Sequence, residues 1–270
     1  MNYYIHNINP IIFSFDIPFL SESLSVRWYG LAYLIGFLLS FLLLKAWSKS
    51  KSLQIKESEV SNFVILLALI GVFLGGRLGY ILFYDFNHFL DDKWLIFKIW
   101  EGGMSSHGGF IGVISVLFWY AKKYSLSFWN LSDHIAATVS LGIGFGRIAN
   151  FINGELWGRV TDVPWAVIFP QSNTILPRHP SQLYQSFCEG FLIFFIILII
   201  RKTNWGKISG NISGLYLSLY AIARFSMEFF REPDSTVYFE WLTKGQAFSI
   251  IMLFFGLIIL FQRKYFLTKN

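Results

Sequence analysis

Long apolar stretches separated by short polar intervals dominate the chain. A helix needs about 20 mostly apolar residues to cross the hydrocarbon core of a bilayer. By this criterion the sequence predicts seven membrane-spanning helices, near residues 28–46, 62–84, 108–121, 132–151, 182–200, 214–230 and 246–262. The third stretch is short and could extend at either end. We therefore expect an all-α integral membrane protein that forms a single polytopic membrane domain over residues 1–270.

Basic residues gather in alternate intervals between these stretches. They follow the first, third and fifth spans and fill the tail, as Lys45, Lys49, Lys51, Lys56, Lys122, Lys123, Arg201, Lys202, Lys207, Arg263, Lys264 and Lys269. Lys and Arg mark cytoplasmic loops. The pattern predicts an amino terminus outside, a cytoplasmic carboxyl terminus and a small extracytoplasmic cap of loops. Residues 1–27 are expected to form an amphipathic segment on one membrane face.

Composition supports a membrane protein and excludes several functions. Apolar residues make up 54% of the chain and charged residues only 14%, against about 25% charged in an ordinary soluble domain. The net charge of +6 is scattered among loops, which argues against a nucleic-acid partner. Cys188 is the single cysteine and the five histidines show no ligand spacing, so we expect neither a metal nor a cofactor.

Polar side chains inside the predicted spans share one half of the bilayer. Burying such groups unpaired costs several kcal/mol, and independent snorkelling residues should scatter between both faces. At 1.5 Å of rise per residue, they fall instead near the outer side. The sequence thus predicts one outward-facing polar cavity, contributed by Tyr29, Arg77, His107, Arg147, Asn150, Glu189, Arg224 and Glu228.

The charges in this set indicate an anionic ligand. Arg224 and Glu228 are four residues apart, which favours an ion pair on one helix face, whether structural or catalytic. Three arginines, including Arg77 and Arg147, outnumber Glu228 and Glu189. Because an Arg fork meets phosphate oxygens in bidentate geometry, a phospholipid head group is the favoured ligand.

Two polar stretches carry the candidate chemistry. His107 lies in a glycine-rich loop, and a histidine side chain, which titrates near neutral pH, is suited to accept a proton. Residues 146–159 read Gly-Arg-Ile-Ala-Asn-Phe-Ile-Asn-Gly-Glu-Leu-Trp-Gly-Arg and place Arg147 and Asn150 in the last turn of a span, with Glu155 just beyond. The glycines at 146, 154 and 158 are expected to leave the backbone open to a head group.

Two other classes of function remain open from the residues alone. A lipid flippase or anion transporter also needs arginines in a membrane cavity, but its polar residues should line the whole path, whereas the cytoplasmic halves here are almost purely apolar. A non-catalytic scaffold would explain the apolar bulk but not the polar cluster. Lipid transfer by detergent-purified protein, without a gradient, would separate an enzyme from a transporter.

Residues 146–159 resemble the signature of the prolipoprotein diacylglyceryl transferase family. The resemblance extends, in family order, through Arg27-Trp28-Tyr29-Gly30, Gly75-Gly76-Arg77-Leu78-Gly79-Tyr80, the His107 loop, His179-Pro180-Ser181-Gln182-Leu183-Tyr184, and the segment from Arg224 to Asp234. Ala149 stands where the family commonly has Gly, a change that should not abolish the site. Gln185 stands where the family usually has Glu, at a peripheral contact.

This resemblance implies an enzyme of the bacterial cytoplasmic (inner) membrane that transfers diacylglyceryl from phosphatidylglycerol to the lipobox cysteine of a preprolipoprotein. Its partners would be phosphatidylglycerol, the lipobox peptide and membrane lipids. The implied catalytic set is His107, Arg147, Asn150, Glu155 and Arg224. Tyr29, Arg147, Asn150 and Arg224 would bind the lipid, supported by Arg77, Glu189, Tyr220 and Glu228. Arg147 and Arg224 would hold the phosphate, and His107 would accept the thiol proton.

Overall fold

The computed structural model describes residues 2–16, 24–98, 103–233 and 242–267, so Asp234 and Lys269 lie outside the described residues. Within these ranges the chain is mostly helical. Five helical runs are long and apolar enough to cross a membrane: Trp28–Lys49, Glu57–Tyr84, Phe128–Asn153, Ser181–Ile200 and Lys244–Gln262. The third and sixth predicted spans also fall on helices, α5 (Ser106–Tyr124) and α9 (Asn211–Met227). That these two also cross stays a prediction.

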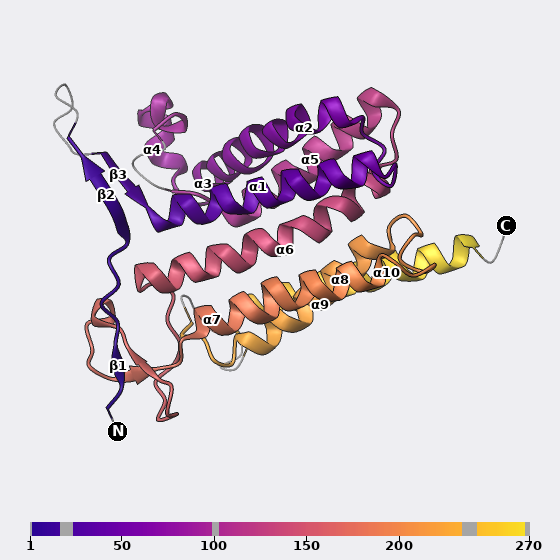
Figure 1. The fold of residues 1–270 in the computed structure, drawn as a ribbon. Coiled ribbons are helices and arrows are strands. Elements are labelled where there is room, and N and C mark those ends of the chain that lie inside the picture. The colour runs from indigo at the N-terminus through magenta and orange to yellow at the C-terminus, as the bar shows by residue number, and fades with distance from the viewer. Residues whose placement is uncertain (1, 17–23, 99–102, 234–241, 268–270) are drawn as a thin grey trace. The chain divides into compact units, whose positions relative to one another are not determined.

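The chain divides into two compact units. The first comprises Met1–Leu39 and Ile135–Asn270, and the second comprises Ser40–His134. Helices α1 (Trp28–Lys49) and α6 (Phe128–Asn153) each contribute to both units. Figure 1 shows the course of the chain through these elements. A single domain over the whole chain stays a prediction.

The second unit is built on a tight helix pair. η1 (Glu57–Glu59), α2 (Val60–Leu66), the π-helical η2 (Leu67–Leu74) and α3 (Gly75–Tyr84) run on as one rod, followed by α4 (Phe86–Asp91) and η3 (Lys93–Ile96). This rod packs on α5 through glycines. A Cβ at Gly108 would lie 2.7 Å from Gly79 Cα, so only hydrogen fits there. Small residues let helix backbones approach closely in this way.

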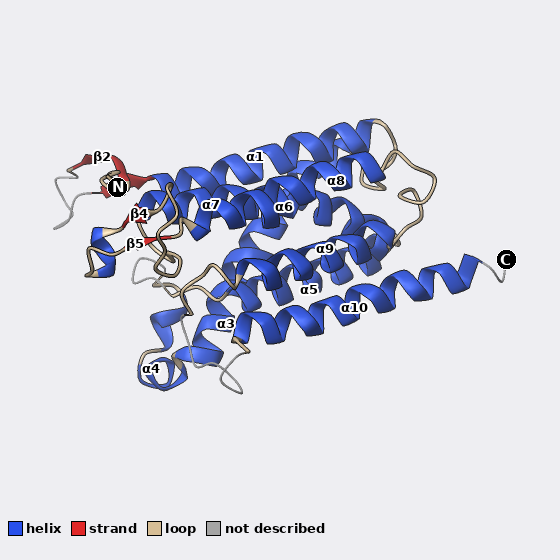
Figure 2. Cartoon of the chain, turned by 90° about the horizontal axis from the view of Figure 1, so that it is seen from below, coloured by secondary structure: helices blue, strands red, loops and turns tan. Residues whose placement is uncertain are grey.

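The first unit gathers the remaining helices. α7 (Ser181–Gln185), the π-helical η6 (Ser186–Phe191) and α8 (Leu192–Ile200) form one rod, and α9 packs along α10 (Lys244–Leu267), as Figure 2 shows. The rod crosses α6 closely. A Cβ at Gly190 would lie 2.7 Å from the backbone nitrogen of Gly144, and Ser186 Oγ donates a hydrogen bond to the Gly144 carbonyl at 2.8 Å.

Short strands correct the all-α expectation, while an extracytoplasmic cap of loops stays a prediction. β1 (Tyr4–Ile5) pairs in parallel with β4 (Val167–Ile168), and β4 pairs antiparallel with β5 (Pro177–Arg178). β2 (Ile11–Phe15) and β3 (Leu24–Arg27) form a second antiparallel pair. Strand formation by the Ile- and Phe-rich segment 11–15 agrees with the β-propensity of these residues. The 3-10 turn η5 (Pro170–Ser172) follows β4.

His6 anchors the amino-terminal strand. Its backbone nitrogen donates to the Ile168 carbonyl at 2.9 Å. Its ring lies edge-on to Phe151, with centroids 5.3 Å apart, and against Phe169. The side chain is buried, and desolvation lowers the pKa of His6 below its usual value.

Candidate functional site

One buried carboxylate joins two arginines from different helices. Glu189, in η6, is fully buried. Its Oε2 lies 3.3 Å from Nη2 of Arg147 in α6, and its Oε1 lies 3.6 Å from Nη1 of Arg224 in α9. Tyr220, one turn before Arg224, also lies close to Arg147. The two guanidinium groups are therefore held together, and removing the shared carboxylate would leave buried charge uncompensated.

The ion pair expected from the four-residue spacing of Arg224 and Glu228 is present. Arg224 Nη1 lies 2.8 Å from Glu228 Oε2. Neither contact is a hydrogen bond, because the Arg224–Glu228 contact lacks the required angles and the Arg224–Glu189 distance of 3.6 Å is too long. Both side chains are largely buried. Arg224 is thus held between two carboxylates by charge, and its Nη1 donates a hydrogen bond to neither of them.

The end of α6 brings Asn150 and Glu155 together. Gly154 adopts a left-handed conformation with φ of 65°. The backbone nitrogen of Gly154 donates to Phe151 O at 2.9 Å, and that of Glu155 to Asn150 O at 3.1 Å. This pair of bonds is a Schellman cap. It folds Glu155 back over the helix, where its Oε1 accepts hydrogen bonds from Asn150 Nδ2 at 2.8 Å and Asn153 Nδ2 at 3.2 Å.

Tyr29 belongs to the same group. It lies at the start of α1, its ring centroid is 5.4 Å from that of Tyr33, and its side chain is close to that of Asn150. The Glu155 carbonyl accepts from Gln182 Nε2 at 2.6 Å, which ties the turn to α7. Asn150 and Glu155 are therefore joined by a hydrogen bond, with Tyr29 close to Asn150, and their role in one site stays a prediction.

Two of the three glycines expected to be open are instead used in packing. Gly154 forms the cap, and a Cβ at this position would clash with the Gln171 side chain. A Cβ at Gly158 would lie 2.5 Å from both the His179 and the Phe230 carbonyl oxygens. The backbone nitrogen of Gly158 donates to His179 O at 2.9 Å. Only Gly146 of the three has open space around it, because Gly154 lies against the Gln171 side chain and Gly158 lies at a close backbone contact.

Arg77 and His107 belong to the second unit. Arg77 is buried and donates to backbone carbonyls of the loops before α5, through Nε to Leu95 O at 3.1 Å, Nη2 to Lys98 O at 2.9 Å and Nη1 to Gly103 O at 3.0 Å. His107 is exposed in the first turn of α5, which Ser105 caps by accepting from Gly108 N at 3.2 Å. Arg77 therefore holds the backbone that precedes α5, the helix on which His107 lies.

Charge in the first-unit cluster is balanced rather than positive. Arg147 and Arg224 face Glu189 and Glu228, two cations against two anions. The expected excess depended on counting Arg77, whose guanidinium holds the loop carbonyls of the other unit. Attraction for an anion at this cluster therefore has to come from the aim of the arginine donors, not from net charge.

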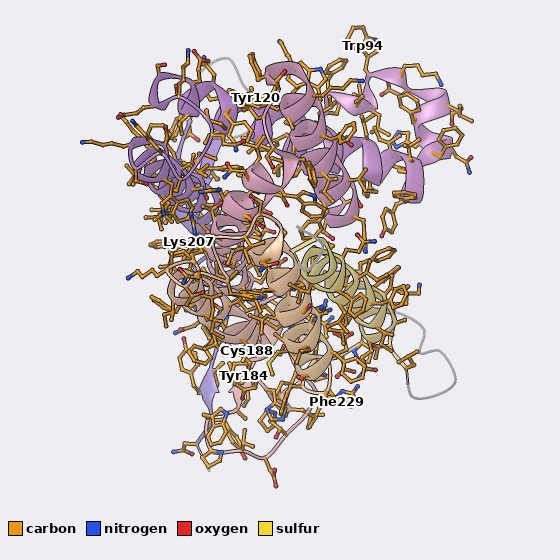
Figure 3. The ribbon with its side chains drawn as sticks, turned by 90° about the vertical axis from the view of Figure 1, so that its right-hand side faces the viewer. Trp94, Tyr120, Tyr184, Cys188, Lys207 and Phe229 are labelled. Atoms are coloured by element: carbon orange, nitrogen blue, oxygen red, sulfur yellow. The ribbon has the colours of Figure 1, made fainter. Side chains whose placement is uncertain are left out.

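An apolar pocket of about 600 Å³ is lined in part by α7, η6 and the end of α9. Tyr184 and Cys188, labelled in Figure 3, line it four residues apart on the α7–η6 rod. Cys188 adjoins Glu189 in sequence. Trp165 Nε1 donates to the Tyr184 hydroxyl at 2.6 Å. The other lining residues are Val163, His179, Leu183, Phe187, Met227 and Phe230.

Three polar residues around the cluster are absent from the set predicted from the sequence. Gln182 holds the Glu155 carbonyl. Thr243 Oγ1 donates to Glu228 Oε1 at 3.0 Å, and Gln246 pairs reciprocally with Thr243. The Thr243-x-x-Gln246 spacing is a capping-box signature just before an apolar run, so the sequence contained the signal for this helix start.

Comparisons with known proteins agree with these motifs. The sequence model of the family described as prolipoprotein diacylglyceryl transferase matches residues 16–262. A phosphatidylglycerol–prolipoprotein diacylglyceryl transferase of Legionella pneumophila (strain Corby) is 48% identical over 254 residues, covering 93% of this chain and 95% of the relative. Enzymes of the same name from Aeromonas hydrophila and Vibrio vulnificus (strain YJ016) are each 45% identical, over 94% of this chain and 89% and 91% of the relatives. The chain belongs to the prolipoprotein diacylglyceryl transferase family.

Proposed function

We propose that this protein is a phosphatidylglycerol–prolipoprotein diacylglyceryl transferase. It catalyses the first step of lipoprotein maturation, moving the sn-1,2-diacylglyceryl group from phosphatidylglycerol to the thiol of the lipobox cysteine. A thioether forms and glycerol 1-phosphate leaves. The observation that carries the proposal is the pair of arginines, Arg147 and Arg224, held by one buried carboxylate, Glu189. Family membership supports the same conclusion.

The reaction is a displacement at the glyceryl carbon that carries the phosphate. The sulfur of the lipobox cysteine forms the new carbon–sulfur bond while the carbon–oxygen bond to phosphate breaks, and the electron pair leaves on the phosphate oxygen. Negative charge on the departing phosphate is stabilised by the donors of Arg147 and Arg224. Because the acceptor thiol comes with the peptide, the enzyme needs no reactive cysteine of its own.

Proton transfer is assigned to His107. A free cysteine thiol, with a pKa of about 8.5, is mostly protonated at neutral pH, so a base that takes its proton raises the thiolate fraction. The exposed position of His107 in the first turn of α5 leaves its imidazole accessible to a substrate. Asn150 and Glu155 would orient the glycerol head, and Tyr29 the ester region.

The membrane frame follows the same proposal. Seven helices cross, with the amino terminus outside and the carboxyl terminus in the cytoplasm, in the bacterial cytoplasmic (inner) membrane. Its support is the alternation of basic loops and the apolarity of the helices. The apolar pocket lined by Cys188 would give an acyl chain an apolar surface.

A direct transfer assay tests the activity. Purified protein is mixed with phosphatidylglycerol and a lipobox peptide, and the peptide mass is measured. A diacylglyceryl gain on the Cys peptide, and none on a Cys-to-Ser peptide, is expected. No gain with folded protein would overturn the proposal and favour lipid transport.

Variants of Arg147 test the site. Arg147→Ala should lower transfer at least about 100-fold, the scale for losing a donor to developing charge. Arg147→Lys keeps the charge but not the fork, and should stay well below wild type. Lys207→Ala removes an exposed cation and is the control. Activity retained in Arg147→Ala would refute the assignment.

A further inference from the structure

Glu228 is in an unfavourable place for a carboxylate unless other groups hold it. It forms the carboxyl-terminal cap of α9, where the helix dipole repels negative charge. It is also almost entirely buried. Arg224 supplies one compensating contact, yet that contact lacks hydrogen-bond angles. The orientation of the Glu228 carboxylate must therefore be set by something else.

The start of α10 supplies that contact. Thr243 precedes the first residue of α10, and its Oγ1 accepts from the Gln246 backbone nitrogen at 3.2 Å, while Gln246 Oε1 accepts from the Thr243 backbone nitrogen at 3.1 Å. This reciprocal pair is a capping box. Because the hydroxyl oxygen is occupied as an acceptor there, its proton is directed to Glu228 Oε1, 3.0 Å away.

Gly245 makes room for the same carboxylate. A Cβ at this position would lie 2.7 Å from Oε1 and 2.9 Å from Oε2 of Glu228. The obstructed atoms are the flexible end of a side chain, so a methyl group there would displace the carboxylate at little cost to the fold. Thr243 and Gly245 thus fix where the carboxylate lies, one by a hydrogen bond and the other by leaving space.

We propose that Thr243 and Gly245 are positioning residues that aim Arg224 by fixing the Glu228 carboxylate. The inference rests on the proposed function, in which Arg224 binds the phosphate. Neither residue needs to touch substrate. Fixing Glu228 Oε1 leaves Oε2 for Arg224, at 2.8 Å, and thereby sets where the guanidinium lies between Glu228 and Glu189. A misplacement near 1 Å can lower the rate by about 100-fold.

Thr243 variants separate positioning from helix capping. Thr243→Val keeps the shape but loses the hydroxyl, and should lower kcat at least tenfold, while Thr243→Ser keeps the hydroxyl and should restore it to within about threefold of wild type. The capping control is Ser127→Ala, since Ser127 Oγ accepts from Asn130 N at 3.3 Å at the start of α6. Its loss should lower Tm about as much as Thr243→Val and leave kcat unchanged.

Gly245→Ala keeps the Thr243 hydroxyl and the capping box, so it tests the positioning role even if Thr243→Val does not fold. It should lower kcat at least tenfold with Tm almost unchanged. Full kcat in Gly245→Ala, or a fall in kcat in Ser127→Ala equal to that in Thr243→Val, would overturn the positioning role. Absence of transfer by wild type in the same assay would instead overturn the proposed function, so the two failures are distinguishable.

Discussion

The crossing of α6 and η6 at Gly144 and Gly190 gives the sharpest test of how the site is held. Gly190→Ala would place a methyl carbon 2.7 Å from the Gly144 backbone nitrogen and close to its Cα. Ordinary contact begins at 3.4 Å, so the two backbones must separate by at least about 0.7 Å. Both obstructing atoms are backbone, so no side chain can rotate away to relieve the clash.

The separation acts directly on the adjacent ion pair. Glu189 precedes Gly190, and its carboxylate already lies 3.3 Å from Arg147, so the same displacement brings the contact close to the limit of an ion pair. Overpacking of this kind costs about 1–3 kcal/mol, which corresponds to a fall in Tm of roughly 2–12 °C for a chain of this size. A displaced Glu189 should also lower transfer about tenfold or more.

Gly142→Ala is the matched control for Gly190→Ala. Gly142 lies half a turn before Gly144 on the same helix, is exposed, and has nothing within 4 Å of the place that a methyl group would take. Its substitution should leave Tm unchanged or raise it slightly, since Ala favours a helix by up to about 1 kcal/mol over Gly. Thermal unfolding in detergent and the peptide transfer assay are the measurements. Equal Tm and equal activity in the two variants would refute a role for the backbone contact.

Two further predictions concern the chain around the site. Because burial lowers the pKa of His6, the folded state binds fewer protons than the unfolded state, so stability should be full above about pH 6.5 and fall as pH drops below it. His6→Gln should lose this pH dependence of Tm, and an unchanged dependence of Tm on pH in the variant would contradict the prediction. Gly154→Ala should lower the free energy of unfolding by about 1–2 kcal/mol, since φ at this cap is 65°, and Gly154→Asn should lower it by less. Denaturant midpoints that rank the two variants in the opposite order would contradict the role of Gly154 in the cap.

The helices could be predicted because their signal is strong and local. Every predicted span falls on a helix, with ends displaced by a few residues. The Arg224–Glu228 pair was equally accessible, because both residues lie on one helix and their spacing sets their separation. β1, β4 and β5 were missed because each is only two residues long and because β1 pairs with β4 across a large separation in sequence.

The contact between Arg147 and Glu189 could not be predicted from the sequence. The residues are 42 positions apart. Their meeting depends on a backbone crossing at Gly144 and Gly190 and on the π-helical turn that carries Glu189. Depth in the bilayer indicated that the charged residues lie at similar levels, but it could not indicate which of them touch. The same limit applies to Arg77, whose partners are backbone carbonyls of loops.

The π-helical segment η6 also sets the rotational phase of its rod. A π turn closes hydrogen bonds one residue later than an α turn, so the helix carries one residue more than a regular path of equal length would need. Each residue of an α-helix advances about 100°, and the side chains before and after Ser186–Phe191 are offset by that amount. Deleting one residue from this segment would return the rod to regular winding. It would also turn either the Gln182 face or the apolar face of α8 away from its present neighbours, so length here is constrained as tightly as residue identity.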